Sequence, residues 1–456
     1  MSASLAVLLT AQAIVSPPAA PAPPAVQPPP PVAADSAAVT RWQHDNAVGK
    51  TLRGLQRDGV DLGFDGVENV AGNPIGGARQ GVREAHFIVG TANLDLERLF
   101  GLSKTRVHIQ GAWFTGDSLG REVIGNSISL QSTFRPVPGP RLTQLSIEHD
   151  FGRLNLLVGR ADENSYFNNS PLNCSFMSSI ICLTGYGAIP VIGITGFPFS
   201  AWAAKARYAV DDRRYVQVMV TEHNMALHAP GKGGLDFSLG KGSGVLLAGE
   251  LGYQTSFAQE RLPRRYKLGV FVNTDGGTSP YYDGSGASAA LSGRPRAALG
   301  GSRVALYGLI DRTIARAPGA GTRNLALFAR GFWNVGNVQM LDSFVSAGFV
   351  KTGTFRHRDE DTVGIILSDA HFSDQQIGNL RDLRARAGGH GAPHHDEIVG
   401  EFSYGWAALH GFKIYPVVQY VLHPDPMFAP KRRTDVPSAV VLGLRADVRL
   451  AQLFGG

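Results

Sequence analysis

Short segments in which apolar and polar residues alternate are the feature that most restricts the fold of this chain. The clearest one lies near the C-terminus, where two interleaved sets occur: Val440, Leu442, Leu444, Ala446, Val448 and Leu450, and Val441, Gly443, Arg445, Asp447 and Arg449. Because successive side chains of a β-strand point to opposite faces, the first set forms an apolar face and the second a polar one. The segment is predicted to be a strand that suits lipid on one side and water on the other.

The same pattern recurs from about residue 60 onwards, between clusters of Gly, Pro, Asp and Asn. Four further examples are Val107, Ile109 and Trp113 against Arg106, His108 and Gln110; Val216, Val218 and Val220 against Tyr215, Gln217 and Thr221; Leu247, Leu251 and Tyr253 against Glu250 and Gln254; and Tyr266, Leu268, Val270 and Val272 against Lys267, Gly269 and Asn273. Roughly sixteen to eighteen such segments fit into the chain, which is more than a single β-sandwich normally uses.

A soluble β-sandwich alternates in the same rhythm, so alternation alone leaves two environments open. The strand number, the charges in the middle of strands and the Trp and Tyr residues near the ends of apolar faces favour a membrane barrel. We expect an all-β fold, a transmembrane antiparallel β-barrel of about 16 strands with a short N-terminal helix. The mean hydropathy of −0.04 agrees, because lipid-facing and lumen-facing residues cancel.

Other classes of protein fit less well. No uninterrupted apolar stretch of about 18 to 20 residues follows the N-terminus, which argues against membrane-spanning helices. The net charge is +6, but the basic residues are scattered, so nucleic acid is not an expected partner. No nucleophile elbow, Walker loop, dinucleotide fingerprint or HExxH motif occurs, so neither an enzyme nor a bound cofactor is expected. A secreted all-β carbohydrate-binding protein or enzyme is the remaining alternative of another class.

Four regions are predicted along the chain. Residues 1–20 are expected to be a signal peptide with a short apolar stretch, although it lacks the usual preceding positive charge, and a disordered apolar tail is the alternative. Residues 21–35 are proline-rich and suit an extended spacer. Residues 36–56 have the pattern of an amphipathic helix, and residues 57–456 are assigned to the barrel.

Two local segments of the chain carry reactive side chains. The only cysteines, Cys174 and Cys182, are spaced to close a short disulfide loop in an oxidising compartment, and no further cysteines exist for a zinc site. The segment with His390, His394, His395, Asp396 and Glu397 could bind a metal, but a flexible surface loop is the preferred interpretation, so no metal site is predicted.

The chain resembles the carbohydrate-selective porins of the OprB family from about Leu52 to Leu450. The resemblance rests on the order of six segments: LRGLQRDGVDLGFDGVENVAGNPIGGARQG, ANLDLERLFGL, RLNLLVGRADENSYFNNSPLNCSFMSSIIC, RRYKLGVFVN, LYGLIDRT and EFSYGWAALHGFKIYPVVQYVLHPDP. It implies a sixteen-stranded, monomeric outer-membrane barrel that passes glucose and similar small sugars by passive diffusion. The alternative is a general or anion-biased porin, which would pass other solutes.

The resemblance also implies contact with outer-membrane lipid and with the barrel-assembly machinery, which reads an aromatic residue at the end of the chain. This chain departs from that pattern, because Phe454 is followed by Gly455 and Gly456.

A sugar pore needs a constriction whose polar and aromatic side chains replace part of the sugar's hydration. Two segments that follow predicted strands supply such residues. The candidates are Asp117, Arg121 and Glu122 in the first segment, and Arg160, Asp162, Glu163 and Tyr166 in the second. The alternative is that these charges belong to solvated loop tips. A disulfide between Cys174 and Cys182 would limit the motion of the second segment.

Overall fold

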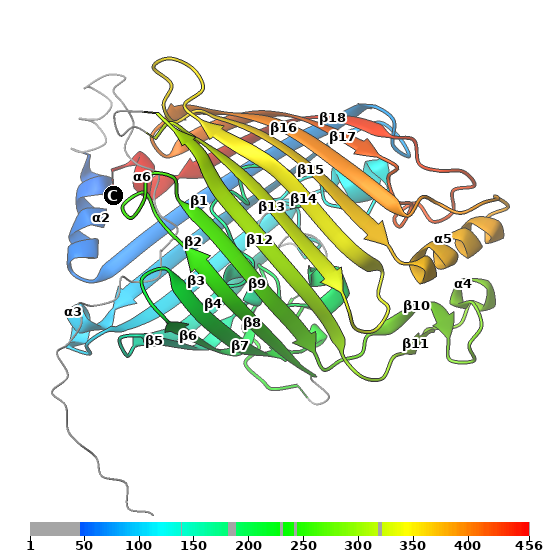
Figure 1. The fold of residues 1–456 in the computed structure, drawn as a ribbon, viewed down its shortest axis with the longest axis horizontal. Helices are drawn as coiled ribbons and strands as arrows, with labels where there is room; N and C mark the ends of the chain where they lie inside the picture. Colours follow the sequence, from blue (N-terminus) through cyan, green and yellow to red (C-terminus); the bar gives the residue numbers. More distant parts are fainter. Residues whose placement is uncertain are drawn as a thin grey trace, which may run out of the picture.

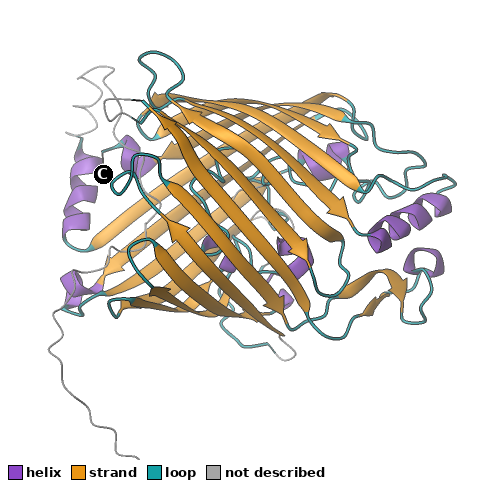
Figure 2. Cartoon of the chain, viewed as in Figure 1, coloured by secondary structure: helices purple, strands orange, loops and turns teal. Residues whose placement is uncertain are grey.

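The computed structural model of the protein describes residues 46–137, 139–180, 188–228, 231–240, 244–317 and 322–455. Sixteen antiparallel strands close into a barrel, as predicted (Figures 1 and 2). They are β1 (Val60–Ile75), β2 (Val82–Asp95), β3 (Thr105–Gly116), β4 (Gly139–Asp150), β5 (Leu154–Ala161), β6 (Ala201–Ala209), β7 (Arg214–His223), β8 (Gly244–Gln254), β9 (Arg264–Asn273), β12 (Arg303–Arg316), β13 (Asn324–Asn334), β14 (Leu341–Thr352), β15 (Thr362–Phe372), β16 (Asp396–Leu409), β17 (Phe412–Leu422) and β18 (Ala439–Arg449). Pairing of β1 with β18 closes the ring.

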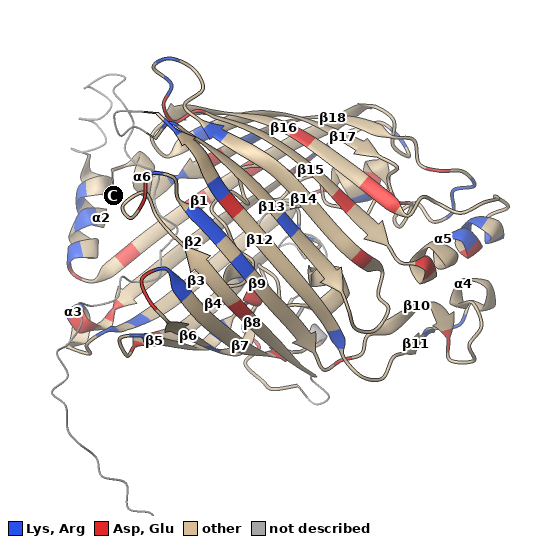
Figure 3. Cartoon of the chain, in the orientation of Figure 1, with Lys and Arg blue, Asp and Glu red and all other residues tan. Residues whose placement is uncertain are grey.

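The two faces of the strands have the environments that their alternation predicts. On β18, Leu442 and Leu444 are 52% and 50% exposed, whereas the next residue, Arg445, is 6% exposed. On β7, Val216 and Val218 are exposed and Gln217 is buried. The outer surface is therefore apolar, and the polar side chains point into the lumen. Figure 3 shows that charged residues occur along the strands as well as in the connections.

Short turns and long connections lie at opposite ends of the barrel. The short-turn end carries the helices α2 (Ala47–Arg57), α3 (Leu96–Phe100) and α6 (Leu450–Leu453). At the turn between β16 and β17, Gly411 has a φ of +80°, a left-handed conformation that glycine adopts without steric cost. Short turns face the periplasm in bacterial barrels, so the long connections mark the extracellular end.

The predicted N-terminal helix is present but shorter in the described residues. Helix α2 begins after Asn46, whose side chain accepts a hydrogen bond from the backbone N–H of Gly49. Such a cap satisfies one of the free N–H groups at a helix start. Residues 1–45, which include the predicted signal peptide, the spacer and the first part of the predicted helix, lie outside the described residues.

The extracellular connections contain the remaining regular elements. A hairpin of β10 (Thr278–Asp283) and β11 (Arg296–Ala298) encloses α4 (Ala289–Ser292), and α5 (Asp374–Arg386) follows β15. Figure 1 shows α4, α5 and the hairpin beyond the end of the barrel. Within the described ranges, no helix combines the length and apolarity needed to span a bilayer.

Two connections fold into the lumen and pack there. We call residues 117–137, after β3, the first inner loop, and residues 162–180 with 188–200, after β5, the second inner loop. Their buried apolar side chains form one cluster with lumen-facing residues of the strands, and it includes Leu119, Ile124, Phe167, Phe176, Met177, Ile192, Phe271, Tyr307 and Phe328. The barrel is therefore not an open tube, because part of its lumen is a close-packed core.

Candidate functional site

The second inner loop is bound to the barrel wall by buried carboxylates. Glu250 on β8 accepts the backbone N–H of Asn168 at 2.8 Å. On the other side of the barrel, Glu401 on β16 accepts the backbone N–H groups of Met177 and Ser178 at 2.6 and 2.9 Å. Hydrogen bonds to a charged acceptor are stronger than neutral ones, so these contacts hold the loop across the lumen.

Glu250 is itself held in place by donors from neighbouring strands. Its oxygens accept from the hydroxyl groups of Tyr215 and Tyr307, each at 2.7 Å, and from Nε2 of Gln217 at 2.9 Å. Nζ of Lys267 lies 3.4 Å away. Because these donors come from β7, β9 and β12, the carboxylate is a rigid acceptor that is prepared before the loop binds.

Basic and acidic wall residues make further contacts to the same loop. Nη1 of Arg445 on β18 donates to the carbonyl oxygens of Cys174 and Phe176 at 3.0 and 2.6 Å. The hydroxyl of Ser170 donates to Asp311 on β12 at 2.5 Å. The loop is therefore held by β8, β12, β16 and β18.

The first inner loop packs against the second. The backbone N–H of Ser132 donates to the carbonyl of Met177 at 2.7 Å, and that of Ser179 donates to the carbonyl of Ser129 at 3.1 Å. Nε2 of Gln131 reaches the backbone carbonyl of Asn69 on β1 at 3.2 Å. The two loops thus form one block that narrows the lumen.

Exposure of the lumen-facing side chains is uneven around the barrel. On the side of β7 to β18 they are buried, as shown by Gln217, Glu250, Asp311, Arg330, Ser346, Ser368, Glu401, Gln419 and Arg445. On β2, β3 and β4 several of the corresponding side chains are half-buried or exposed, as shown by Asn93, Arg106, His108, Gln110 and Gln144, although Ser146 and Glu148 on β4 are buried. The inner loops therefore cover one side of the lumen and leave part of the wall of β2, β3 and β4 accessible.

Polar side chains form a connected group on the accessible side. Nε2 of Gln144 donates to the hydroxyl of Tyr166 at 2.8 Å, and Nζ of Lys205 lies 4.4 Å from the centre of the Tyr166 ring. Further along the wall, Nε2 of His108 lies 2.6 Å from Glu148. Gln144, Tyr166 and His108 are partly exposed and can offer hydrogen-bonding groups and one aromatic ring to the lumen, whereas Lys205 and Glu148 are buried.

Three aromatic rings form a separate cluster near the extracellular ends of β2 and β3. Phe87 on β2, Phe114 on β3 and Phe197 of the second inner loop have ring centres 5.3 to 6.4 Å apart. Phe87 and Phe197 remain partly exposed. Nε of Arg135 donates to the carbonyl of Phe197 at 3.1 Å, which ties the first inner loop to this cluster. Partly exposed rings in a water-filled pore can contact the apolar faces of a sugar.

The predicted residues of the first segment lie together at the extracellular end of the lumen. Asp117, Arg121 and Glu122 are all exposed. Glu122 forms an ion pair of 2.8 Å with Arg83 on β2, and the guanidinium of Arg121 lies 4.2 Å from the ring of Phe428. They are separate from the group around Tyr166.

Arg160 lies apart from the other predicted residues. It pairs in register with Leu145 and Trp202, which are exposed on the outer surface, and it shares the strand face of Val158. Its guanidinium donates to the carbonyl oxygens of Ser200 and Asp236 and is buried beneath residues 231–240.

Asp162 and Glu163 are buried in the second inner loop. The carboxylate of Asp162 caps the short turn at Glu163–Ser165 by accepting the N–H of Ser165 at 2.9 Å. Glu163 accepts the N–H of Thr195 at 2.9 Å, which joins the two ends of the loop. Burial raises the pKa of Asp162 to about 7 and that of Glu163 to about 8, because both carboxylates lose hydration.

The structure describes the predicted histidine cluster fully but only one of the two cysteines. Cys174 lies in the second inner loop, while Cys182 falls within 181–187, outside the described residues, so their pairing stays a prediction. In the extracellular connections, His394 stacks on His423 with ring centres 3.7 Å apart, and His371 near the end of β15 lies 2.5 Å from Asp396 at the start of β16. Among the described residues, no set of three or more His, Cys, Asp or Glu side chains is arranged to hold a metal.

Several residues of the barrel wall and the inner loops that take part in these contacts are not among the site residues predicted from the sequence. They are Gln144, Glu148, Lys205, Phe87 and Phe197, together with Glu250 and His108, which had been placed only on polar strand faces. The polar wall residues share one signal, which is the lumen-facing position within an alternating strand. No local feature of the sequence distinguishes the positions that the inner loops leave accessible.

Comparison with known proteins identifies the family. The family model for carbohydrate-selective porins, OprB family, matches residues 79–450. Porin B of Pseudomonas aeruginosa is 26% identical over 428 residues, covering 89% of this chain and 90% of that protein. The high-pH structure of Pseudomonas putida OprB superposes with a TM-score of 0.79 at 24% identity, covering 88% of this chain and 97% of that one. Its low-pH structure gives 0.53 at 18% identity, covering 89% and 97%.

These similarities agree with the closed sixteen-stranded barrel and its narrowed lumen. The match to the family model extends over most of the chain, from the turn between β1 and β2 to the end of β18. The chain therefore belongs to the OprB family of carbohydrate-selective porins and is a channel of the outer membrane.

Proposed function

We propose that the protein passes monosaccharides such as glucose by passive diffusion, through a constriction between Tyr166 of the second inner loop and the wall of β3 and β4. The observation that supports this proposal is the uneven exposure of the lumen-facing side chains around the barrel. Side chains under the inner loops are buried, whereas His108 and Gln144 on the facing wall are partly exposed. A permeating solute meets the accessible wall first.

The chemistry of this wall suits a neutral polyol. Gln144 and His108 offer donors to sugar hydroxyl groups, and the rings of Tyr166 and Phe197 can lie against the apolar face of a pyranose. The polar side chains are already bonded to one another, as in the Gln144–Tyr166 pair. A sugar therefore exchanges hydrogen bonds instead of gaining new ones, and this keeps binding weak enough for release.

The residues predicted from the sequence take different parts in this proposal. Tyr166 contacts the sugar, while Asp162 and Glu163 hold the shape of the loop that carries it. Asp117, Arg121 and Glu122 belong to the extracellular mouth, where they meet the solute before the constriction. Arg160 lies outside the path, because its guanidinium is bound beneath residues 231–240.

The proposal also includes the remaining partners. The exposed apolar faces of the strands, such as Leu442 and Leu444 on β18, would contact outer-membrane lipid. We include insertion by the barrel-assembly machinery on the basis of the closed β-barrel. Phe454 lies after α6 and is not part of the last strand, since β18 ends at Arg449.

Single-channel current in planar bilayers tests the sugar assignment. Graded glucose should reduce the current of the wild-type channel, and Tyr166→Ala should raise the glucose concentration needed for half block roughly tenfold, because it removes a stacking surface and a hydroxyl. Tyr420→Ala is the matched control, since Tyr420 is half-exposed on the outer surface. A wild-type current that glucose does not reduce would indicate a general pore, and equal block in both variants would exclude the proposed constriction.

A further inference from the structure

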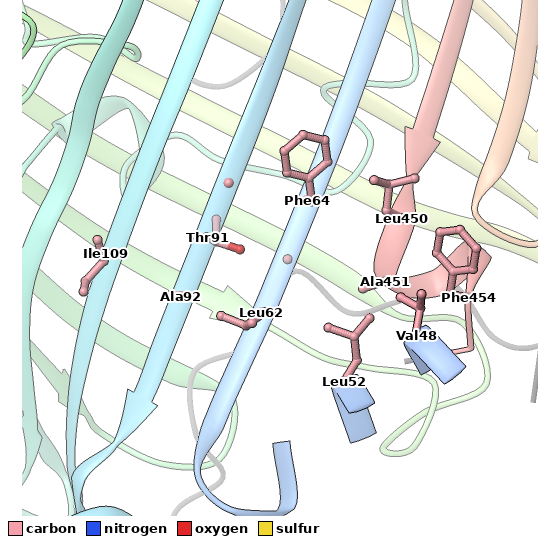
Figure 4. Close-up of a pocket in the computed structure, with 12 residues that line it drawn as sticks. Val48, Leu52, Leu62, Phe64, Thr91, Ala92, Ile109, Leu450, Ala451 and Phe454 are labelled. Atoms are coloured by element: carbon pink, nitrogen blue, oxygen red, sulfur yellow. The ribbon is translucent and has the colours of Figure 1, made fainter. Parts of the chain in front are cut away.

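An apolar groove lies on the outer surface of the barrel near the periplasmic end of the seam between β1 and β18. It runs between α2 and the outward faces of β1, β2 and β3, and α6 borders it (Figure 4). Its volume is about 440 Å³. The side chains that line it are Val48, Leu52, Leu62, Phe64, Ala92, Ile109, Leu450 and Phe454. An adjoining space continues it along Ala47, Thr51 and Leu55 of the helix.

The groove exists because α2 is held away from the barrel wall. Nδ2 of Asn46 donates to the carbonyl of Phe454 at 3.0 Å, and the guanidinium of Arg53 donates to the carbonyl of Gly455. At the other end of the helix, Nη1 of Arg98 on α3 donates to the carbonyl oxygens of Gln56 and Arg57 at 3.1 and 3.2 Å. The helix is thus fixed at both ends by polar contacts instead of by packing on the wall.

The floor of the groove is formed by small residues. Gly90 and Ala92 on β2 lie between the larger side chains of Phe64 on β1 and Ile109 on β3. Phe64 and Ile109 are themselves exposed on the outer surface. The result is a trough that opens toward the hydrocarbon of the membrane, where an extended apolar chain fits better than a polar ligand.

The opposite side of α2 carries positive charge. Val48, Leu52 and Leu55 share one face of the helix, and Lys50, Arg53 and Arg57 share the other, because the helix repeats every 3.6 residues. Lys50 and Arg57 are exposed. A helix with an apolar face and a basic face suits the membrane interface, with its cations at the depth of lipid phosphates.

We propose that this groove is a binding site for one anionic glycerophospholipid of the periplasmic leaflet. One acyl chain would lie in the trough between Leu52, Phe64 and Ile109. The phosphate would lie beside Lys50 and Arg57. The charge of the helix favours an anionic headgroup, and the position at the short-turn end selects the periplasmic leaflet. The site is separate from the lumen and does not depend on which solute the pore passes.

Native mass spectrometry of the full-length protein in detergent tests the site. With graded dioleoylphosphatidylglycerol, one lipid should bind more tightly than all others. Ala92→Trp fills the trough and should weaken this first binding about tenfold, the effect of excluding roughly two methylene groups. Ala347→Trp is the matched control, because Ala347 on β14 is exposed on the outer surface away from the groove. If Ala92→Trp fails to fold, Val48→Gln on the helix changes the lining without altering a strand.

The headgroup is tested with dioleoylphosphatidylcholine. The Lys50→Gln and Arg57→Gln double variant should reduce the preference for the anionic lipid and leave binding of the zwitterionic one unchanged. Equal lipid binding by wild type, Ala92→Trp and Ala347→Trp would overturn the proposal. It would also be overturned by a dimer that Ala92→Trp dissociates, which would make a second copy the occupant, or by first-lipid binding that appears only when the residues before Asn46 are removed.

Discussion

Glu250 and Asn168 are joined by a 2.8 Å hydrogen bond in which a wall carboxylate accepts a backbone N–H of the second inner loop. The contact links β8 to a residue only two positions after Tyr166. A backbone donor does not depend on the identity of its side chain, so the position of Tyr166 is set mainly by the wall. The width of the constriction should therefore respond to changes in Glu250 that never touch a sugar.

Glu250→Gln should loosen the second inner loop. A glutamine offers one acceptor oxygen in place of two, so donors from Tyr215, Tyr307, Gln217 and Asn168 compete for it. Leaving a buried donor without a partner costs about 1–3 kcal/mol. We expect a lower melting temperature and a noisier open-channel current in planar bilayers. Glu84→Gln on β2 is the control, because Glu84 is exposed. The same noise in both variants would argue against this role of Glu250.

Gly364→Ala should displace the second inner loop by steric contact. A Cβ atom at this position of β15 would lie 2.9 Å from Cε1 of Phe176, which is too close for carbon atoms. Phe176 is buried and packs edge-on against Phe328, so its ring has little room to move. Overpacking of this kind costs typically about 1–3 kcal/mol. Unfolding in denaturant and single-channel conductance should both change.

Gly308→Ala provides the comparison for that experiment. On β12 the nearest atom to an added Cβ is a backbone oxygen at 4.0 Å, so the substitution is accommodated. Conductance of Gly308→Ala should equal that of the wild type. An unchanged conductance in Gly364→Ala as well would show that Phe176 does not set the position of the loop.

The stability of the protein should fall as the pH rises through the range in which Glu163 ionises. Burial raises the pKa of Glu163 from 4.5 to about 8, so the folded protein binds this proton more tightly than the unfolded chain does. The contribution to the free energy of unfolding is present below about 4.5 and is lost as the pH rises to about 8. Glu163→Gln stays neutral and should show a smaller fall of melting temperature across this range. The fall should not vanish, because burial also raises the pKa of Asp162. A pH dependence identical to that of the wild type would refute the assignment.

Reduction of the predicted disulfide should increase the current noise of the channel. A bridge between Cys174 and Cys182 would restrict the second inner loop, and Arg445 already holds the carbonyl of Cys174 at 3.0 Å. Treatment with dithiothreitol and the double variant Cys174→Ser, Cys182→Ser should have the same effect. Noise that is unchanged by both treatments would remove this role, whereas an effect of dithiothreitol on the double variant would point to a different target.

The barrel could be predicted from the sequence because its signal is local. Leu442, Leu444 and Arg445 show the environment of β18 within four residues, and the structure confirms it. The strand number followed from counting such segments. The packed lumen was not predictable in this way, since Phe176 and Met177 carry no periodic pattern and their partners Phe328 and Glu401 lie far along the chain.

The same difference between local patterns and distant contacts applies to the residues of the candidate site. Tyr166 is predicted from its residue type and its place in the chain, while Lys205 and Gln144 beside it belong to β6 and β4, which are brought together by pairing with β5. For Arg160, the alternation within its strand predicts the direction of the side chain better than its position just before the second inner loop does. Two residues after the outward Val158, it lies on the same strand face, and residues 231–240 then cover its charge.

The contact between the two ends of the chain has a consequence for the order of folding. Asn46 and Phe454 are hydrogen-bonded across a separation of 408 residues, and β1 pairs directly with β18. Contacts between such distant residues carry the largest entropy of loop closure, so they form late unless something holds the ends together. Neither the groove beside α2 nor the closed barrel is complete before β1 pairs with β18. The last strand to be synthesised therefore closes the wall that starts with the first strand.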